Sequence, residues 1–385
     1  MKKLLIIHNK YQIPGGEDSN IHDEILHLKN SYKIQYLEFN NNEKFRVNDL
    51  LSLLTRSNII SNRLLKKELK SFNPDAVYVH NTWFKANLGI FKILKKNNIN
   101  TLFKVHNFRY DCSRFFLASN HLRKSKICNA CHFNKENKIF NKYYEESYLK
   151  SLFLIFYSKK LFKIIKNYPL KIVVLTDFHK IYLSSLGVSK SKIFTYFNPI
   201  TLNGNRVEKP SRNRYAVYAG RLTKEKGVEN LIECWIAANL ENFKLKIIGS
   251  GNLLADLINK YKSSNIEFLG ELSNQDTLLQ IKQSSAVITA TKMYEGQPRL
   301  LCEASSFGVP SIYPSFGGLD EFFPEDYSLS FNQFDYEDLK LKILELKNND
   351  KLIENGSKAY NKIIVKLNHN DLLNQFHKIL MYELL

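Results

Sequence analysis

Short apolar runs rich in β-branched residues recur along this chain, and amphipathic stretches of helical length separate them. Ten such runs stand out, at residues 4–7, 34–39, 76–79, 101–105, 172–175, 216–219, 245–248, 266–269, 286–290 and 311–313. Strands that alternate with helices in this way are typical of βαβ units, whose sheets are parallel and covered on both faces. We therefore expect an α/β fold with a doubly wound sheet in each half of the chain.

The length of 385 residues favours two domains, because a single hydrophobic core rarely serves so long a chain. A polar, turn-rich segment at residues 197–212 separates the two sets of strands. We expect an N-terminal domain over residues 1–200 and a C-terminal domain over residues 201–365. A helix within residues 366–385 is expected to pack back toward the N-terminal domain.

The formal net charge of +19 favours a polyanionic partner, such as a phosphorylated substrate, an acidic membrane surface or a nucleic acid. A lysine-rich composition spread over solvated faces would explain the same charge. The sequence has no zinc-finger, helix-turn-helix or RNA-recognition signature, so we expect no nucleic-acid partner.

No apolar run approaches the roughly 20 residues of a membrane span. The apolar run at the start stops after four residues, which is short for a signal peptide. Five cysteines, an odd number, fit a reducing compartment. We therefore expect a cytoplasmic protein, either soluble or peripheral on the inner face of the cell membrane.

Two carboxylates, Glu295 and Glu303, lie eight positions apart around a turn that opens a helix. A helix start carries unpaired N–H groups and a partial positive charge, and Pro298 suits the first helical turn. A phosphate can bind there, with one carboxylate reaching a group on each side of it. A nucleotide sugar has hydroxyls on both sides of its diphosphate, which matches this pattern.

Cations and glycines also follow the predicted strands of the second half. Arg221 comes directly after the 216–219 strand, and Lys226 stands at the start of the next helix. Both would project into the crevice where doubly wound sheets bind ligands, and both suit phosphate oxygens. A solvated basic loop is the alternative. Gly249, after the 245–248 strand, would allow a base or ribose to approach closely.

The first half offers weaker signals. Gly15-Gly16 follows the first strand and would let the backbone approach a ligand, although no G-x-G-x-x-G is present. His106 follows the 101–105 strand and can donate to a sugar hydroxyl or to a developing charge. Structural roles are the alternative for both.

For each of two further features of the sequence, a functional and a structural interpretation are open. Three cysteines and a histidine could hold a structural zinc ion, but their spacing is not that of a standard finger, and free or paired thiols are favoured. These residues are Cys112, Cys128, Cys131 and His132. Residues 143–168 interleave lysines with Leu, Phe and Ile, so this segment could rest on an anionic bilayer or pack on its own domain with its lysines in solvent.

Taken together, the second half resembles the retaining GT-B glycosyltransferases of the group-1 (family four) type. The resemblance rests on residues 218–227, residues 295–303, Gly308-Val309-Pro310 and Gly317-Gly318. Glu295 and Glu303 match the E-x7-E motif of that family. In the more divergent first half, Gly15-Gly16 and His106-Asn107-Phe108-Arg109 look like the family's glycine loop and the histidine after a strand.

The resemblance implies two facing Rossmann-like domains with a cleft between them, the donor mainly on the second and the acceptor on the first. Arg221 and Lys226 would hold the diphosphate, Glu303 the ribose and Glu295 the transferred sugar. The following turn would contact sugar and phosphate; it consists of Gly296, Gln297, Pro298 and Arg299.

In the first domain the family pattern implies that Gly16 lies close to the phosphate and that His106 orients or stabilises the reacting sugar. The catalytic set is thus Arg221, Lys226, Glu295 and His106. Arg299 departs from the family pattern, because it adds a cation near the donor.

The implied activity is transfer of a hexose, with retention of anomeric configuration, from a UDP- or GDP-sugar to a glycan or a polyprenyl-diphosphate-linked acceptor. Such a reaction would serve surface polysaccharide synthesis, meaning capsule, O-antigen or exopolysaccharide. Two fixed cations can replace a divalent metal, and the sequence has no matching Asp-x-Asp motif, so we expect a metal-independent enzyme without a cofactor. A sugar-nucleotide epimerase, a phosphorylase and a non-catalytic nucleotide- or carbohydrate-binding scaffold are the alternatives.

Overall fold

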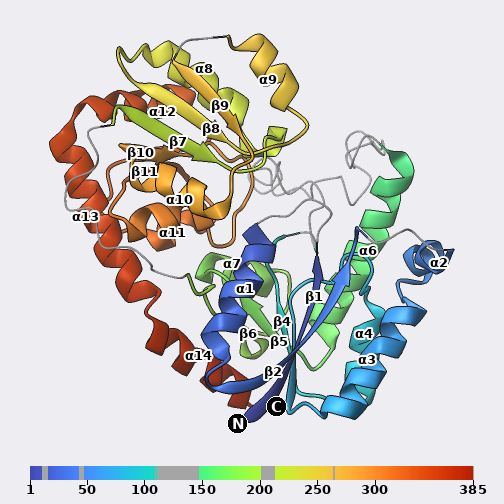
Figure 1. The fold of residues 1–385 in the computed structure, drawn as a ribbon. Coiled ribbons are helices and arrows are strands. Elements are labelled where there is room, and N and C mark those ends of the chain that lie inside the picture. The colour runs from blue at the N-terminus through green and yellow to red at the C-terminus, as the bar shows by residue number, and fades with distance from the viewer. Residues whose placement is uncertain are drawn as a thin grey trace. The chain divides into compact units, whose positions relative to one another are not determined.

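The computed structural model describes residues 1–10, 16–42, 47–108, 110, 147–200, 213–262 and 265–384. These residues form two compact units, which Figure 1 draws as ribbons. The first unit contains the described residues up to Pro199 together with those from His369 onward. The second unit contains the described residues from Ile200 to Asn368.

The first unit is built on a parallel sheet of six strands in the order β2-β1-β3-β4-β5-β6. The strands are β1 (Lys2–Lys10), β2 (Tyr32–Asn40), β3 (Ala76–Val79), β4 (Thr101–Lys104), β5 (Lys171–Val174) and β6 (Ile193–Thr195). Every residue of β3, β4 and β5 is buried. A parallel sheet with both faces covered needs such continuous apolar strands.

Helices cover both faces of this sheet. They are α1 (Gly16–Leu28), α2 (Val47–Thr55), α3 (Ile59–Phe72), α4 (Gly89–Lys96), α6 (Tyr148–Asn167), α7 (Asp177–Ser185) and α14 (His369–Met381). Figure 1 shows α3, α4 and α6 on one side of the sheet and α1 and α14 on the other. Side-chain oxygens cap three of these helix starts, since Asn58 accepts from the first turn of α3, Ser147 from that of α6 and Thr176 from that of α7.

The last helix, α14, belongs to the core of the first unit. Phe376 has no exposed surface, and its ring centroid lies 5.6, 5.3 and 5.4 Å from those of Tyr32, Tyr78 and Tyr196. One ring of α14 and three tyrosine rings from much earlier in the chain therefore form a single aromatic cluster.

The second unit contains a parallel sheet of six strands in the order β12-β11-β10-β7-β8-β9. The strands are β7 (Tyr215–Ala219), β8 (Lys244–Ile248), β9 (Ile266–Gly270), β10 (Ala286–Ile288), β11 (Ser311–Ser315) and β12 (Ser330–Asn332). The helices are α8 (Val228–Ala238), α9 (Leu254–Lys260), α10 (Asn274–Lys282), α11 (Arg299–Ser306), α12 (Tyr336–Leu344) and α13 (Asn349–Lys366).

In each sheet the strand order reverses once. The reversal lies between β1 and β3 in the first unit and between β7 and β10 in the second. Doubly wound sheets bind ligands outside the carboxyl ends of their strands at such a reversal, which is called the topological switch point. The turns that follow these four strands are therefore the regions where a ligand site is expected.

The predicted α/β fold with two doubly wound sheets is confirmed. All ten predicted strands are present, whereas β6 and β12 were missed because each has only three residues and carries polar side chains. The lysine-rich segment at residues 143–168 forms α6 from Tyr148 onward, and its residues before 147 lie outside the described part of the chain. Among the described residues, no helix is long and apolar enough to cross a membrane.

Candidate functional site

The switch point of the second unit brings a lysine and a glutamate together. Lys226, in the turn after β7, places its Nζ 2.6 Å from Oε1 of Glu295, in the loop after β10. The Thr291 hydroxyl donates to the same carboxylate oxygen at 2.9 Å. About a fifth of each side chain of the ion pair is exposed, at 21% for the lysine and 20% for the glutamate. A ligand can therefore reach both groups.

A glycine makes this contact possible. Gly227 has φ +66°, and a Cβ there would lie 2.0 Å from the carbonyl oxygen of Ala290. The backbone of the turn after β7 thus packs directly against the loop after β10, which sets Lys226 beside Glu295. The Lys292 N–H also donates to the Glu225 carbonyl at 2.9 Å and joins the same two segments.

The turn after β8 supports this arrangement from the other side. Gly249 has φ +132°, and a Cβ there would lie 2.1 Å from the Gly220 carbonyl oxygen. This packing against the β7 turn is itself a sufficient reason for glycine at position 249. The side chain of Arg221 is exposed, while its carbonyl accepts a hydrogen bond from the Tyr218 hydroxyl at 2.9 Å.

The second predicted carboxylate, Glu303, lies in α11 and is 7% exposed. The helix begins at Arg299, one residue after Pro298, and has no side-chain cap at its N-terminus. Nε of Arg299 donates to Oε1 of Glu303 at 2.6 Å. Arg299 was expected to act as an added cation for the donor, whereas in the structure it lies on the glutamate of its own helix. Gly296 is buried, and Gln297 is half-buried.

One titratable group beneath these turns is strongly perturbed. Burial, with a further contribution from Glu295, raises the pKa of the Tyr218 phenol above its ordinary range. The phenol is therefore protonated at neutral pH and keeps donating to the carbonyl of Arg221. This bond fixes the backbone from which the exposed guanidinium projects.

In the first unit, two histidines meet at the ends of β3 and β4. Nδ1 of His80 and Nε2 of His106 lie 3.2 Å apart, and their rings stack with centroids 5.4 Å apart. Burial lowers the pKa of both imidazoles well below the ordinary value, and the charge of Lys104 contributes to both shifts. Both rings are thus neutral at neutral pH, so one nitrogen of the contact donates and the other accepts.

A buried ion pair stands behind the histidines. Nζ of Lys104 lies 2.8 Å from Oε2 of Glu24, and neither side chain is more than 1% exposed. The Tyr78 hydroxyl donates to Oε1 of Glu24 at 2.9 Å, and Oε2 lies 3.9 Å from Nε2 of His80. Burial raises the pKa of Glu24 and lowers that of Lys104, and the attraction between the two opposes both shifts.

The sequence singled out His106 but not His80, which contacts it, nor Glu24 and Lys104, which form the ion pair nearby. A usable signal was present for His80, because it follows a strand in the same way as His106. The side chains next to these histidines line a cavity of about 40 Å³, which includes Asn81, Thr82, Trp83 and Tyr157.

The structure adds little to the predictions for Gly16 and for the cysteine cluster. Gly16 begins α1, and a Cβ built there would meet no atom within 4 Å, so packing does not require glycine at this position. The possible zinc ligands Cys112, Cys128, Cys131 and His132 lie outside the described residues. In the part of the chain that the structure describes, no group of three or more His, Cys, Asp or Glu residues could hold a metal ion.

The lysine-rich helix α6 packs on its own unit. Its buried side chains are Leu154, Ile155, Tyr157, Leu161, Ile164 and Ile165. Its exposed lysines are Lys150, Lys159, Lys160, Lys163 and Lys166. The helix therefore packs on its own unit, and the exposed side that carries its lysines stays available for the predicted contact with an anionic bilayer.

Comparison with known proteins places the second half of the chain. Residues 201–362 match the family described as "Glycosyl transferases group 1". This part of the chain is therefore similar to the group 1 glycosyltransferases. Among curated proteins, the chain is 33% identical over 149 residues to the amylovoran biosynthesis glycosyltransferase AmsD of Erwinia amylovora. That match covers 37% of this chain and 42% of AmsD, so it spans about two-fifths of the relative's length.

Solved structures with the same architecture cover the whole chain. Anabaena HepE, in complex with UDP and glucose, has a TM-score of 0.70 at 14% identity and covers 99% of both chains. Sucrose-phosphate synthase from Thermosynechococcus elongatus has a TM-score of 0.72 at 14% identity and covers 98% of both chains. The fold is GT-B, as the resemblance implied.

Proposed function

We propose that this protein is a glycosyltransferase that moves a sugar from a nucleotide diphosphate sugar to a glycan acceptor. The observation that carries this proposal is the Lys226–Glu295 pair, accessible at the switch point of a group 1 glycosyltransferase domain. An ammonium suits the phosphates of such a donor, and a carboxylate suits the hydroxyls of the sugar attached to them.

Groups of the bound donor would replace contacts that side chains of the protein make with one another in its absence. A phosphate oxygen would share the ammonium of Lys226, which frees Glu295 to accept from sugar hydroxyls. Ribose hydroxyls would likewise donate to Glu303 beside Arg299, and the uncapped N-terminus of α11 would face the diphosphate. Arg221 would supply the second phosphate cation, and the turn of Gly296, Gln297 and Pro298, which follows Glu295 directly, would contact the sugar and the phosphates.

The chemistry that follows is electrostatic. The bond between the anomeric carbon and the diphosphate oxygen breaks, and negative charge develops on the leaving diphosphate. Arg221 and Lys226 are fixed cations that would stabilise this charge, so we propose that transfer needs no divalent metal. The acceptor hydroxyl would attack from the face that the leaving group vacates, passing its proton to a donor phosphate oxygen, which retains the configuration.

His106 is proposed to contact the reacting sugar from the first unit. Because burial keeps its imidazole neutral, it can donate or accept a hydrogen bond without introducing charge. The donor is proposed to be a UDP- or GDP-hexose, and the HepE complex with UDP and glucose favours UDP.

The acceptor is proposed to be a growing surface glycan, in line with the role of AmsD in amylovoran biosynthesis, carried on a polyprenyl diphosphate at an anionic membrane. Exposed apolar side chains occur on α2, α3 and α6, and α3 and α6 also carry basic residues. They are Leu50, Leu51, Leu54, Ile59, Ile60, Leu64, Tyr148, Leu149 and Phe156. The Arg56 guanidinium lies 5.5 Å from the ring of Phe156 and links α6 to the α2–α3 connection. Apolar groups with a basic rim favour anionic bilayers.

Three measurements test these proposals. Thermal shifts with UDP-, GDP- and ADP-sugars should show stabilisation by one of them, because a ligand bound by the folded state raises the melting temperature. Transfer to glycan acceptors should then follow with that donor; binding without turnover, or interconversion of donors without an acceptor, would contradict the activity. Flotation with anionic and neutral vesicles tests the membrane, and equal recovery with both would contradict it.

A further inference from the structure

The loop that joins β3 to α4, residues 80–88, has an unusual distribution of side chains. Trp83 and Phe84 are adjacent and half-buried, whereas the other seven residues of the loop are buried. These buried residues are His80, Asn81, Thr82, Lys85, Ala86, Asn87 and Leu88. We call this segment the β3–α4 loop. Two large aromatic side chains are thus partly exposed to solvent on a loop whose other residues are buried.

Side chains from the ends of β1 and β2 hold one side of the loop. Oδ1 of Asn9 accepts from the Ala86 N–H at 2.9 Å, and the Asn9 carbonyl accepts from Nδ2 of Asn81 at 3.0 Å. Nδ2 of Asn41 donates to the Trp83 carbonyl at 3.0 Å. The backbone on both sides of the aromatic pair is thus bound to the sheet.

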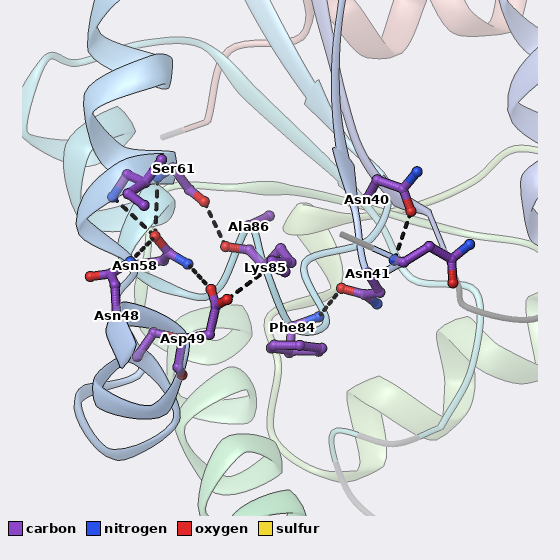
Figure 2. Close-up of polar contacts among 12 residues, drawn as sticks. Asn40, Asn41, Asn48, Asp49, Asn58, Ser61, Phe84, Lys85 and Ala86 are labelled. Atoms are coloured by element: carbon purple, nitrogen blue, oxygen red, sulfur yellow. Dashed lines mark hydrogen bonds and ion pairs between the residues drawn. The ribbon is translucent and has the colours of Figure 1, made fainter. Parts of the chain in front are cut away.

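The α2–α3 hairpin holds the other side. Nζ of Lys85 lies 2.7 Å from Oδ2 of Asp49, whose second oxygen accepts from Nδ2 of Asn58 at 3.1 Å. The Ser61 hydroxyl donates to the Lys85 carbonyl at 2.6 Å. Figure 2 shows Asp49, Asn58 and Ser61 gathered around Lys85, with Asn41 beside Phe84 on the opposite side of the loop.

This network makes the β3–α4 loop rigid before any ligand arrives. Ordering a loop on binding costs free energy, and a loop ordered during folding avoids that cost at the moment of recognition. The loop also follows β3, which borders the switch point of the first sheet. A rigid loop at this place is suited to recognition, because ligands of doubly wound sheets bind there.

The groups around the aromatic pair define what kind of ligand fits. The Trp83 ring packs edge-on against Tyr157, with centroids 4.8 Å apart, and lines the same cavity as His80, Asn81 and His106. Lys104, which also lines this cavity, is buried in an ion pair with Glu24, and Lys85 of the loop is buried in an ion pair with Asp49. An aromatic face beside amides and neutral imidazoles suits a sugar, which has an apolar C–H face and hydroxyl edges.

We propose that Trp83 and Phe84 form a subsite for a neutral sugar ring of the acceptor, and that the Asp49–Lys85 pair positions this subsite. The proposal deepens the glycosyltransferase function proposed above and rests on it. The sugar ring lies against the indole face, and its hydroxyls contact the amide and imidazole groups of the cavity.

The two tryptophans of the chain allow a direct test. Trp83 and Trp235 are the only ones, and Trp235 is buried in α8 of the second unit. In the full-length Trp235→Phe protein, emission reports Trp83 alone. Methyl glycosides of glucose, galactose and N-acetylglucosamine should include at least one that protects Trp83 from acrylamide quenching with saturation, while a methyl glucuronide protects less.

Two outcomes would overturn the subsite. In the first, no glycoside protects Trp83, although UDP or a UDP-sugar still raises the melting temperature; the donor function then stands and the subsite does not exist. In the second, 1-octanol protects Trp83 and the glycosides do not, which would assign the aromatic pair to the lipid of an acceptor. If neither donor nor glycoside has an effect, both proposals fail together.

Transfer kinetics provide the second readout, with a glycoside that protected Trp83 as acceptor. Trp83→Ala should raise the KM for acceptor roughly tenfold and leave the KM for donor unchanged, because the ring contacts only the acceptor. Tyr382→Ala removes a ring that is 40% exposed in the same unit and serves as the control. Equal acceptor KM values for the two variants would overturn the proposal.

Discussion

The strand order reverses once in each of the two sheets, yet the lysine–glutamate pairs near these two switch points differ in burial. At the switch point of the second unit, Lys226 and Glu295 form an ion pair about one-fifth exposed. Beside the switch point of the first unit, Lys104 and Glu24 form an ion pair with almost no exposure. Lys104 also lines the cavity there, and the other side chains that line it are neutral. A related sheet topology thus fixes where a ligand binds, while burial decides whether the ion pair can exchange a partner for a charged ligand.

The largest effect is expected when the same substitution is made in both pairs. Lys104→Met should lower the free energy of unfolding of the first unit by about 3–5 kcal/mol, because it leaves Glu24 buried without its cation. Lys226→Met should cost at most about 1 kcal/mol, because water can reach Glu295. Urea denaturation measures both, with the emission of Trp83 followed in a Trp235→Phe background for the first unit and that of Trp235 in a Trp83→Phe background for the second. Equal losses in the two units would show that burial does not separate the pairs.

The next effect concerns activity and sharpens the role of the exposed cations. Arg221→Ala should reduce kcat about 10²–10³-fold, corresponding to roughly 2.7–4 kcal/mol, as the loss of a preorganised donor does in other enzymes. Lys224→Ala, which removes an exposed cation from the same turn, is the matched control and should retain activity. If both variants keep rates within a factor of about two of the parent, the leaving diphosphate is not stabilised by Arg221.

A third effect should be confined to the first unit, because no histidine occurs between residues 200 and 368. Burial lowers the pKa of His179 to about 3, and those of His80 and His106 are also lowered. Below about pH 6.5 the unfolded chain binds protons that the folded unit does not, so stability falls as the pH falls toward the folded pKa values. Each histidine should cost about 1 kcal/mol between pH 7 and 5.5.

The pH dependence of urea denaturation measures this difference between the units. His179→Gln should flatten the slope seen with Trp83, while His22→Gln, at an exposed position of α1, should leave it unchanged. An equal acid sensitivity of the emission of Trp235 would contradict the assignment of the effect to the first unit.

The smallest effect concerns the pair within α11. Glu303→Gln should raise the KM for donor about tenfold, because a charged acceptor of ribose hydrogen bonds becomes a neutral one. Arg299→Ala removes the cation from the same carboxylate and should change the KM for donor less. Steady-state kinetics at saturating acceptor distinguish the two, and an unchanged KM for Glu303→Gln would remove the ribose contact from the mechanism.

The fold was readable from the sequence where its signals are local. Buried parallel strands are continuous apolar runs, so β3 and β8 could be located to within one residue, and the turns after them followed at once. Residues of the second site, such as Lys226 and Glu295, were found because each lies in such a turn. The two short strands at the sheet edges lacked a comparable signal.

Contacts between residues that are far apart in the sequence could not be predicted from such local patterns. Glu24 and Lys104 are 80 positions apart, and Asp49 and Lys85 are 36 apart, so no spacing links either pair. Arg299 is different, because an arginine four residues before a glutamate in a helix is a recognised ion-pair spacing. That signal was present in the sequence and would have predicted the contact with Glu303.

The packing of Phe376 against Tyr32, Tyr78 and Tyr196 has a consequence for biosynthesis. The described residues of the first unit come from two separated stretches, and those of the second unit are translated between them. Because α14 is the last helix to be made, the second unit can be complete while the tyrosines of the first unit still lack their final aromatic partner. Chains released without residues 369–385 should therefore show a protease-resistant second unit attached to a protease-sensitive first one.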